Sequence, residues 1–420
     1  MMIYAIDYGT SNSLLAGART KKPFEPLALD DANEDPTIFR SVMFFPMNGG
    51  VFFGKAAVKA YDEFRSEGRL FRSIKKYLPV RSFSGTWVGS EFRPLEDLIS
   101  RFLREMRERA NAQTGVDADA VVLGRPARYA LDDEADRLAQ TRMEKAAKMA
   151  GFKHVEFYPE PLAAAHEYRK TLKSEKLVLV ADLGAGTSDF TVLKIGPGPL
   201  RASDVLAVGG VSVAGDALDS TIMDGRVAPF LGTEVKYRLP LSSNVLTMPI
   251  DIRHKLSSPP DIALMTRQDV MHFLKSVQKA ALGDHEKDKL ERLFVLIEEN
   301  LGFQIYEAIE GSKRAVCRAG RAKLEFPYPG IELATSFEDG DFEMWSRPKL
   351  EAILGSLDET VKLAGVGLGD IDLICCTGGT AKVPQFARQL ESRFGREKIE
   401  QFDHFHSVIK GLAERASELG

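Results

Sequence analysis

Residues 2–13, MIYAIDYGTSNS, and residues 177–189, LVLVADLGAGTSD, share one design. In each, an apolar run of strand length ends in Asp, an apolar residue and Gly, and a Thr follows shortly after. The chain then enters a second apolar run, so each stretch predicts a β-hairpin with a glycine-containing turn. Asp7 and Asp182 stand at matching points of the two stretches, far apart in the chain. Such a near-copy predicts an internal duplication of a whole lobe.

The segments between and after the hairpins alternate between strand and helix patterns. Strands are predicted over residues 118–124, 155–158 and 371–377. Helices are predicted over 132–151 with Asp132 as the cap, over 160–168, and over 407–418. The sequence therefore predicts an α/β fold.

Two long insertions interrupt the predicted lobes. They cover about 35–115 and about 216–347, and the second shows helical charge patterns over 284–313. We expect a first lobe over 1–172, a second over 173–405, and a C-terminal helix, 406–420, that returns to the first lobe.

Length and composition exclude several classes of protein. A chain of 420 residues exceeds what one hydrophobic core usually serves, which favours two lobes or domains. A formal net charge of −4 argues against a nucleic-acid binder. Cys317, Cys375 and Cys376 form no metal-ligand or disulfide pattern, and His404 with His406 is typical of a surface pair. No signal peptide or membrane-length apolar run is visible, so we expect a cytoplasmic protein without membrane contact.

The two hairpin turns are candidate anion sites. Glycine lets backbone N–H groups approach an anion, and neighbouring hydroxyls add donors for phosphate oxygens. A carboxylate at the strand end can hold Mg²⁺ or its waters. One such turn alone could equally be a tight hairpin with a capping Asp. Two of them, followed by a Gly378-Gly379 element after a buried strand, favour a clamp on a polyphosphate and its hydrated metal.

This order of motifs resembles the actin, sugar-kinase and heat-shock-70 superfamily. Within it, the chain is most similar to the ATPase domain of the heat-shock-70 chaperones. The resemblance rests on residues 7–13 and 182–189 as phosphate signatures, 160–165 as the connecting segment, and 378–384 as the adenosine motif. It implies a duplicated actin-like ATPase fold with ribonuclease H-like lobes, a nucleotide cleft between them, and ATP or ADP with Mg²⁺ as cofactors.

The resemblance assigns roles on the phosphate side of the site. Asp7 and Asp182 would order Mg²⁺, mostly through water, and Thr187 and Asp189 would place the attacking water. Glu160 would lie near the metal and, with Pro126, relay lobe closure. The residues that would cradle the phosphates are Gly9, Thr10, Ser11, Asn12, Gly184, Ala185, Gly186 and Thr187.

Lys75 lies in a segment, 71–78, that resembles the one holding the catalytic lysine of the family. A lysine beside the γ-phosphate would stabilise developing charge and orient water. The alternative is a surface lysine in a basic helix.

The adenosine side departs from the family pattern at two positions. Cys317 stands where serine is usual, and Lys382 replaces an arginine that stacks on adenine. Because a thiol is a poor donor and lysine has no planar face, both changes predict weaker nucleotide binding. The implied contacts are Gly215, Asp216, Glu310, Lys313, Arg314, Gly378, Gly379, Thr380 and Lys382, with a helix cap as the alternative for Gly215-Asp216.

The function that follows is a slow Mg-dependent ATPase whose nucleotide state controls lobe closure and the binding of an unidentified protein partner. The chain stops nine residues after Gly411, so the peptide-binding β-sandwich of the chaperones is not expected in it. Alternatives are a small-molecule or sugar kinase with Asp189 as base, an actin-like filament or scaffold protein, and a non-catalytic nucleotide sensor. The oligomeric state stays open.

Overall fold

The computed structural model describes residues 1–420 except 65–66, 131, 170–171, 199–201, 240–241 and 402–405. The chain forms two compact units. Unit 1 contains Met1–Ala214 and Ile353–Gly420, and unit 2 contains Gly215–Ala352. Within the described part of the chain, no helix combines the length and apolar character that a membrane span requires.

The first hairpin begins a mixed sheet in unit 1. Strands β1 and β2 pair antiparallel so that Asp7 lies opposite Leu14, and β1 pairs parallel with β10. The strand order is β11-β10-β1-β2-β3, with β4 added to β2. The bounds are β1 Met2–Tyr8, β2 Asn12–Arg19, β3 Lys22–Phe24, β4 Phe39–Arg40, β10 Ala120–Arg125 and β11 His154–Pro159.

The second hairpin begins a sheet of the same topology, also in unit 1. Strands β12 and β13 pair antiparallel with Asp182 opposite Asp189, and β12 pairs parallel with β19. The order β20-β19-β12-β13-β14 repeats the first sheet strand for strand. The bounds are β12 Lys176–Leu183, β13 Ser188–Ile195, β14 Val205–Val211, β19 Leu373–Thr377 and β20 Ile399–Gln401. The predicted duplicated actin-like fold is confirmed.

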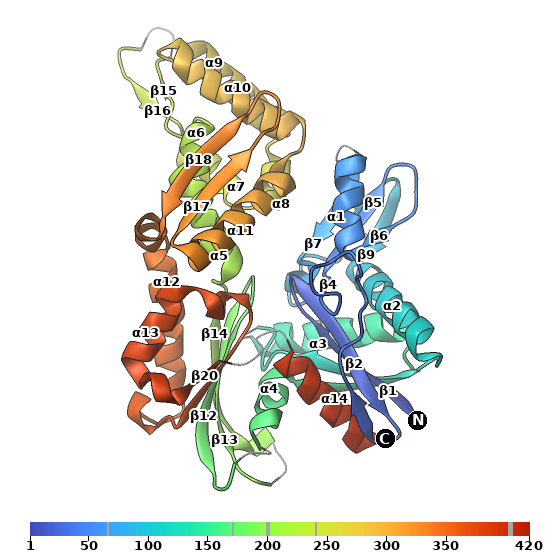
Figure 1. The fold of residues 1–420 in the computed structure, drawn as a ribbon. Coiled ribbons are helices and arrows are strands. Elements are labelled where there is room, and N and C mark those ends of the chain that lie inside the picture. The colour runs from blue at the N-terminus through green and yellow to red at the C-terminus, as the bar shows by residue number, and fades with distance from the viewer. Residues whose placement is uncertain (65–66, 131, 170–171, 199–201, 240–241, 402–405) are drawn as a thin grey trace. The chain divides into compact units, whose positions relative to one another are not determined.

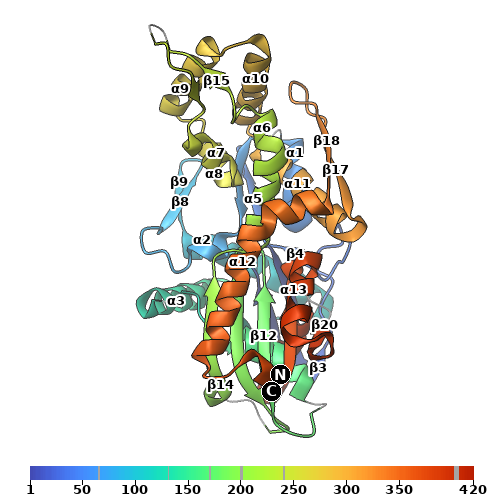
Figure 2. The same cartoon turned by 90° about the vertical axis from the view of Figure 1, so that its left-hand side faces the viewer.

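The helices of unit 1 occupy equivalent places in the two repeats. Helix α3 connects β10 to β11 as α13 connects β19 to β20, and α4 and α14 each follow the last strand of a repeat. The bounds are α2 Leu95–Thr114, α3 Asp133–Met149, α4 Glu160–Arg169, α12 Asp339–Leu363, α13 Pro384–Phe394 and α14 Ser407–Leu419, with α12 beginning in unit 2. Helices α12 and α13 lie over one face of the second sheet (Figures 1 and 2).

Hydrophobic cores within the described part of unit 1 pack its helices against its sheets. One core packs α2 and α3 against the first sheet and includes Phe102, Met143 and Tyr8, with the rings of Tyr8 and Phe102 5.6 Å apart. Another core contains Ala163 of α4 and Leu412 of α14 together with apolar residues of both sheets. In Figure 1, α4 and α14 lie between the two sheets. The small side chains of α4 allow α14 to approach closely. Small residues on α4 thereby join the two repeats.

The first insertion also lies within unit 1 and ends in α2. A 3₁₀ helix, Ile74–Tyr77, carries Lys75 and follows Ser73, whose backbone is left-handed at φ 58°. Asp30 accepts a hydrogen bond from the Lys55 backbone N–H at 2.8 Å near the start of α1. The bounds are β5 Val42–Pro46, β6 Phe52–Phe53, α1 Gly54–Glu63, β7 Gly68–Arg72, β8 Gly85–Val88 and β9 Glu91–Pro94.

Unit 2 is formed by helices and a β-hairpin. The β17 strand alternates exposed and buried residues, so one face of the hairpin packs on α11 (Figure 2). The predicted helical region 284–313 consists of two helices, separated at Asn300 with φ 53°. The bounds are α5 Gly215–Ile222, α6 Ala228–Phe230, β15 Lys236–Tyr237, β16 Leu246–Thr247, α7 Ile250–Leu256, α8 Pro259–Leu264, α9 Gln268–Ala280, α10 Asp284–Glu298, α11 Gly302–Ala319, β17 Arg321–Phe326 and β18 Leu333–Glu338.

The other predicted elements are present with small shifts at their ends. The predicted helix over 132–151 is α3, and the Asp132 side chain accepts a hydrogen bond from the Ala135 backbone N–H at 2.8 Å. Of the predicted histidine pair, His404 lies outside the described residues, and His406 contacts Thr37 and Asp35. The division into lobes at about 172 and 405 stays a prediction.

The packing of α14 on α4 predicts unequal effects of two glycine substitutions. A Cβ at Gly411 would lie 1.9 Å from the Ala163 carbonyl oxygen, whereas a Cβ at Gly355 of α12 meets nothing within 4 Å. Gly411→Ala should lower the free energy of unfolding by about 1–3 kcal/mol. The control, Gly355→Ala, should raise it by about 1 kcal/mol. Denaturant unfolding measures both, and a Gly411→Ala protein as stable as the wild type would contradict the close packing.

Candidate functional site

The two hairpin turns meet within unit 1. A Cβ at Gly9 would lie 2.1 Å from the Asn12 carbonyl oxygen, so only glycine permits the first turn. In the second turn, the Gly184 backbone N–H donates to the Thr187 carbonyl at 3.0 Å. A Cβ at Gly186 would lie 3.6 Å from Cγ2 of Thr10. The two turns are therefore in direct proximity.

The Gly378-Gly379 element attaches to the second turn. Gly378 has a left-handed backbone at φ 82°, and a Cβ there would lie 2.2 Å from the Leu183 carbonyl oxygen. Oγ1 of Thr380 donates to the Gly184 carbonyl at 2.8 Å, and Oγ1 of Thr377 donates to Asp182 at 3.0 Å. The end of β19 thus fixes both the turn and the carboxylate of β12.

Lys75 is the cation of this site. Its Nζ lies 3.2 Å from Oε1 of Glu160, the first residue of α4. Only 13% of the Lys75 side chain and 8% of the Glu160 side chain are exposed, so the alternative of a surface lysine is wrong. Burial by itself would lower the pKa of Lys75, but Glu160, Tyr129 and Asp7 raise it above its usual value. Lys75 is therefore held as an ammonium ion.

Asp7, Asp182 and Asp189 surround this ion pair with further carboxylates. Each is partly accessible at the surface, yet desolvation by burial is the largest cause of its raised pKa. Burial and the Glu160 charge raise the pKa of Asp182 to about 6, and burial and Asp182 raise that of Asp189 to about 7. The pKa of Asp7 is raised by burial, Glu160 and Asp182. One lysine does not balance this charge.

A positive ligand would relieve the imbalance. Carboxylate oxygens suit a hard divalent cation such as Mg²⁺. Among the described residues, no three Asp, Glu, His or Cys side chains converge closely enough to ligate one ion directly. Because Mg²⁺ keeps several of its waters, the donor set fits a hydrated ion held by Asp7 and Asp182 through water.

Thr187 and Asp189 form a second polar pair at the second turn. Oγ1 of Thr187 donates to Oδ2 of Asp189 at 2.8 Å, and Thr187 is exposed. A carboxyl with a raised pKa beside an exposed hydroxyl can orient water and accept its proton. Glu160 lies against the end of β10, because a Cβ at Gly124 would be 3.3 Å from its Oε1. Pro126 follows that strand end directly, and its carbonyl accepts from Nε of Arg125 at 3.2 Å.

The predicted adenosine contacts of unit 2 engage one another. Lys313 lies 2.9 Å from Oδ1 of Asp219 and donates to the Gly215 carbonyl at 3.1 Å. Arg314 pairs with Glu310 at 3.7 Å on the same helix. Burial raises the pKa of the Cys317 thiol to about 11, so this cysteine is unreactive. Asp216, at the start of α5, has an interaction partner of its own.

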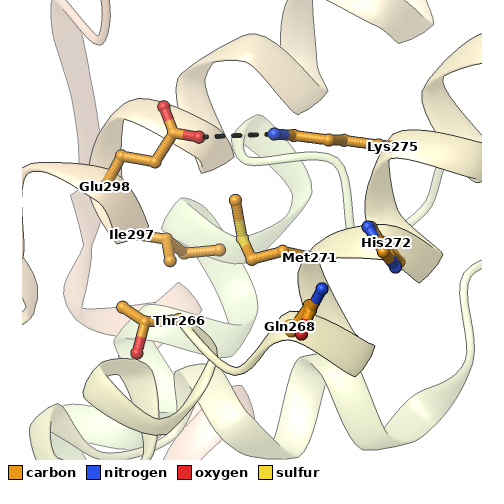
Figure 3. A pocket seen from close by; sticks show the side chains of 7 residues that line it. All are labelled: Thr266, Gln268, Met271, His272, Lys275, Ile297 and Glu298. Atoms are coloured by element: carbon orange, nitrogen blue, oxygen red, sulfur yellow. Dashed lines mark ion pairs between the residues drawn. The ribbon is translucent and has the colours of Figure 1, made fainter.

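Unit 2 also has a shallow pocket of about 380 Å³ between α9 and α10. Met271 and Ile297 point toward each other at its centre, and Lys275 pairs with Glu298 across it at 4.0 Å (Figure 3). Both charged side chains are about half exposed. None of the predicted site residues lines this pocket.

Comparison with known proteins gives a consistent result. The family model described as Hsp70 protein matches residues 81–248. A relative named "Chaperone protein HscA homolog" from Bordetella petrii is 25% identical over 99% of this chain. Proteins named "Chaperone protein DnaK" from Thermotoga petrophila and Thermus thermophilus are 26% and 24% identical over the same share. The chain is an Hsp70-like protein.

This Hsp70-like chain spans less than two thirds of the length of those relatives. It covers 57% of the Bordetella petrii protein, 59% of the Thermotoga petrophila protein and 60% of the Thermus thermophilus protein. The resemblance inferred from the sequence motifs is confirmed by these similarities. The roles predicted for individual residues stay predictions.

Tyr129 and Asp219 are parts of these arrangements that sequence reasoning missed. Among the described residues, the buried Tyr129 hydroxyl oxygen has no hydrogen-bond partner, and burial raises the pKa of this phenol to about 12. The Lys75 and Glu160 charges also act on the pKa of this phenol. Asp219 could have been found, since it lies one helical turn after Gly215. No pattern singles out Tyr129.

Removal of the Tyr129 hydroxyl should stabilise the ligand-free Hsp70-like chain. A buried donor without a partner costs about 1–3 kcal/mol, so Tyr129→Phe should raise the free energy of unfolding. Tyr4 is the matched control, since its hydroxyl contacts Oδ1 of Asn111 at 3.0 Å and Oγ1 of Thr114 at 2.8 Å. Tyr4→Phe should lower stability by about 1 kcal/mol. Denaturant unfolding measures both variants. An equal loss in the free energy of unfolding for Tyr129→Phe and Tyr4→Phe would show that the Tyr129 hydroxyl is hydrogen-bonded.

Proposed function

We propose that this Hsp70-like chain binds ATP and ADP together with Mg²⁺ and hydrolyses ATP slowly. In this proposal the bound nucleotide governs lobe closure and the binding of a protein partner in the cytoplasm. The observation that carries the proposal is the buried Lys75–Glu160 pair among Asp7, Asp182 and Asp189, directly beside two touching glycine turns. The names of the relatives, HscA homolog and DnaK chaperones, support the same class.

The two turns would hold the polyphosphate. Backbone N–H groups at glycine turns are anion donors that need no reorganisation. Thr10, Ser11 and Asn12 would add donors from the first turn, and Gly184, Ala185 and Gly186 would line the second. The Ser11 hydroxyl supports this role, because it is buried, has no hydrogen-bond partner among the described residues, and could donate to a phosphate oxygen.

Hydrolysis would follow in-line attack by water on the γ-phosphorus. Asp189, held by Thr187, would orient the water and accept its proton, since a pKa near 7 suits a general base at neutral pH. Lys75 would stabilise the charge that develops on the γ-phosphate oxygens. A bound Mg²⁺ would supply further neutralisation of the phosphates, with Asp7 and Asp182 contacting its waters and Glu160 nearby.

The adenosine contacts of this proposal rest on the motif resemblance. They are Gly378, Gly379, Thr380 and Lys382 of the element after β19, and Gly215, Asp216, Glu310, Lys313 and Arg314. The Lys313–Asp219 ion pair favours a structural role for Lys313, because Asp219 already neutralises the Lys313 charge within unit 2.

A phosphotransferase is the second candidate, and the raised pKa of Asp189 favours it equally. A general base at this position could deprotonate a substrate hydroxyl as readily as water. Phosphate release from ATP without an added acceptor would support the ATPase. Transfer to a hydroxyl compound, with negligible release in its absence, would support the kinase.

The Thr187 hydroxyl should matter for hydrolysis but not for binding. Without it, Asp189 loses its 2.8 Å hydrogen bond, so Thr187→Ala should slow single-turnover ATP hydrolysis by about 10²-fold and leave ADP affinity unchanged. The matched control is Thr191→Val in the interior of β13, whose hydroxyl is buried without a hydrogen-bond partner among the described residues and lies outside the turn. Unchanged turnover in Thr187→Ala would remove this residue from the mechanism.

A further inference from the structure

Arg142 of α3 binds the segment that follows Lys75. Its Nη1 lies 3.2 Å from the carbonyl oxygen of Tyr77, 3.0 Å from that of Leu78 and 3.0 Å from that of Val80. Arg142 is 9% exposed, and in the described part of the chain it forms no ion pair. The buried guanidinium of Arg142 is therefore hydrogen-bonded to three backbone carbonyls.

Burial of the Arg142 charge, which has no carboxylate partner among the described residues, is energetically unfavourable unless its hydrogen bonds stabilise another segment. Arginine is almost never fully buried without a carboxylate partner, because its charge must leave water. The carbonyls at the end of a helix lack intrahelical partners, and a cation there both satisfies them and complements the helix dipole. Arg142 thus closes the C-terminal end of the 3₁₀ helix Ile74–Tyr77, from an element more than 60 residues away in sequence.

The other end of the same helix is strained. Ser73 precedes it with φ 58°, a left-handed conformation that costs about 1–3 kcal/mol for a residue with a side chain. Such a conformation persists only where its surroundings determine it strongly. Buried Ile74 and Leu78 and the stacked rings of Tyr77 and Phe83, 4.4 Å apart, provide part of that constraint.

Helix α3 also holds the end of β10 and the loop that follows it. Its Asp136 accepts two 3.0 Å hydrogen bonds from Arg125 and one of 2.7 Å from the Tyr129 backbone N–H. The Arg125 guanidinium lies 5.4 Å from the centre of the Tyr129 ring. One helix therefore contacts both the 3₁₀ helix of Lys75 and the loop after β10.

We propose that Arg142 is a positioning residue for Lys75. By fixing the carbonyls of Tyr77, Leu78 and Val80, its guanidinium keeps the 3₁₀ helix in the one placement where Nζ of Lys75 meets Glu160 at the phosphate turns. The contribution to hydrolysis rests on the ATPase proposed above. The contribution to the placement of the helix does not.

The hydrolysis test is a double-mutant cycle. Arg142→Met keeps side-chain length without charge, and Arg142→Lys keeps the charge with fewer donors. Arg142→Met should slow single-turnover hydrolysis about tenfold or more, since small misplacements of catalytic groups have effects of this size. ADP affinity should change less than about twofold, Arg142→Lys should recover part of the rate, and Arg142→Met should have no further effect in a Lys75→Ala background.

Arg107→Met is the matched control. Arg107 also donates to a backbone carbonyl, that of Ala118 at 2.7 Å, and its side chain is 15% exposed. Its partners, Ala118 and Asp117 at 2.6 Å, both lie outside the Lys75 segment. This variant should hydrolyse ATP at the wild-type rate. If Arg142→Met slows hydrolysis equally with and without Lys75, or not at all, the positioning role is wrong.

A ligand-free measurement keeps the inference separate from the ATPase proposal. Amide hydrogen exchange at Leu78 and Val80, whose N–H groups donate to Lys75 and Tyr77, should be at least about tenfold faster in Arg142→Met than in the wild type. Arg107→Met should leave both amides unchanged. Wild-type protein that fails to hydrolyse ATP, with this exchange difference present, would overturn only the ATPase. Unchanged exchange at both amides in Arg142→Met would overturn the positioning role whatever the activity.

Discussion

The structure depends on an excess of negative charge at the ends of two equivalent strands. Asp7 and Asp182 are each the second-last residue of their strands, β1 and β12. Glu160 and Asp189 add two more carboxylates, and Lys75 is the lysine that faces them. Desolvation makes the charged forms of these carboxylates unfavourable in the free protein. The raised pKa values of Asp7, Asp182 and Asp189 reflect this effect. Clustered carboxyl groups with raised pKa values are typical of functional sites, where a ligand interacts with them. In the proposed function, a hydrated cation with a polyphosphate would supply both the missing positive charge and an anion for the adjacent glycine turns.

The duplicated fold brings these groups together from distant parts of the chain. Each repeat ends its first strand in a glycine turn, and the cores around α4 and α14 hold the two sheets close enough for the turns to touch. The helix that begins with Glu160 is also the one that packs against α14. The chemistry of the site is thereby tied to the core that joins the repeats, so its geometry depends on the small residues of that helix.

Local patterns were sufficient to predict much of this fold. The hairpins, the capped helix α3 and the C-terminal helix each depend on short-range alternation, glycine or a cap, and their sequences show them. The pairing of Lys75 with Glu160, the three carbonyls bound by Arg142 and the buried hydroxyl of Tyr129 depend on tertiary placement. No spacing links residue 142 to residue 77, because the contact exists only after α3 has packed against α2. The sequence motif predicts Lys313 as a nucleotide contact, but the ion pair of Lys313 with Asp219 could not be predicted from it. A sequence pattern that places a residue on a helix does not give the partner of its side chain.

Calorimetric titration of the ligand-free protein with ADP tests the central claim most directly. One titration contains Mg²⁺, and a second contains a chelator instead of Mg²⁺. Done at neutral pH in two buffers of different ionisation heat, the calorimetry also counts the protons exchanged on binding. The account predicts Mg-dependent binding with net proton release, because a nearby cation lowers the raised pKa values of the Asp7, Asp182 and Asp189 carboxyls. No binding at millimolar nucleotide, or binding that is indifferent to Mg²⁺ and releases no protons, would contradict it.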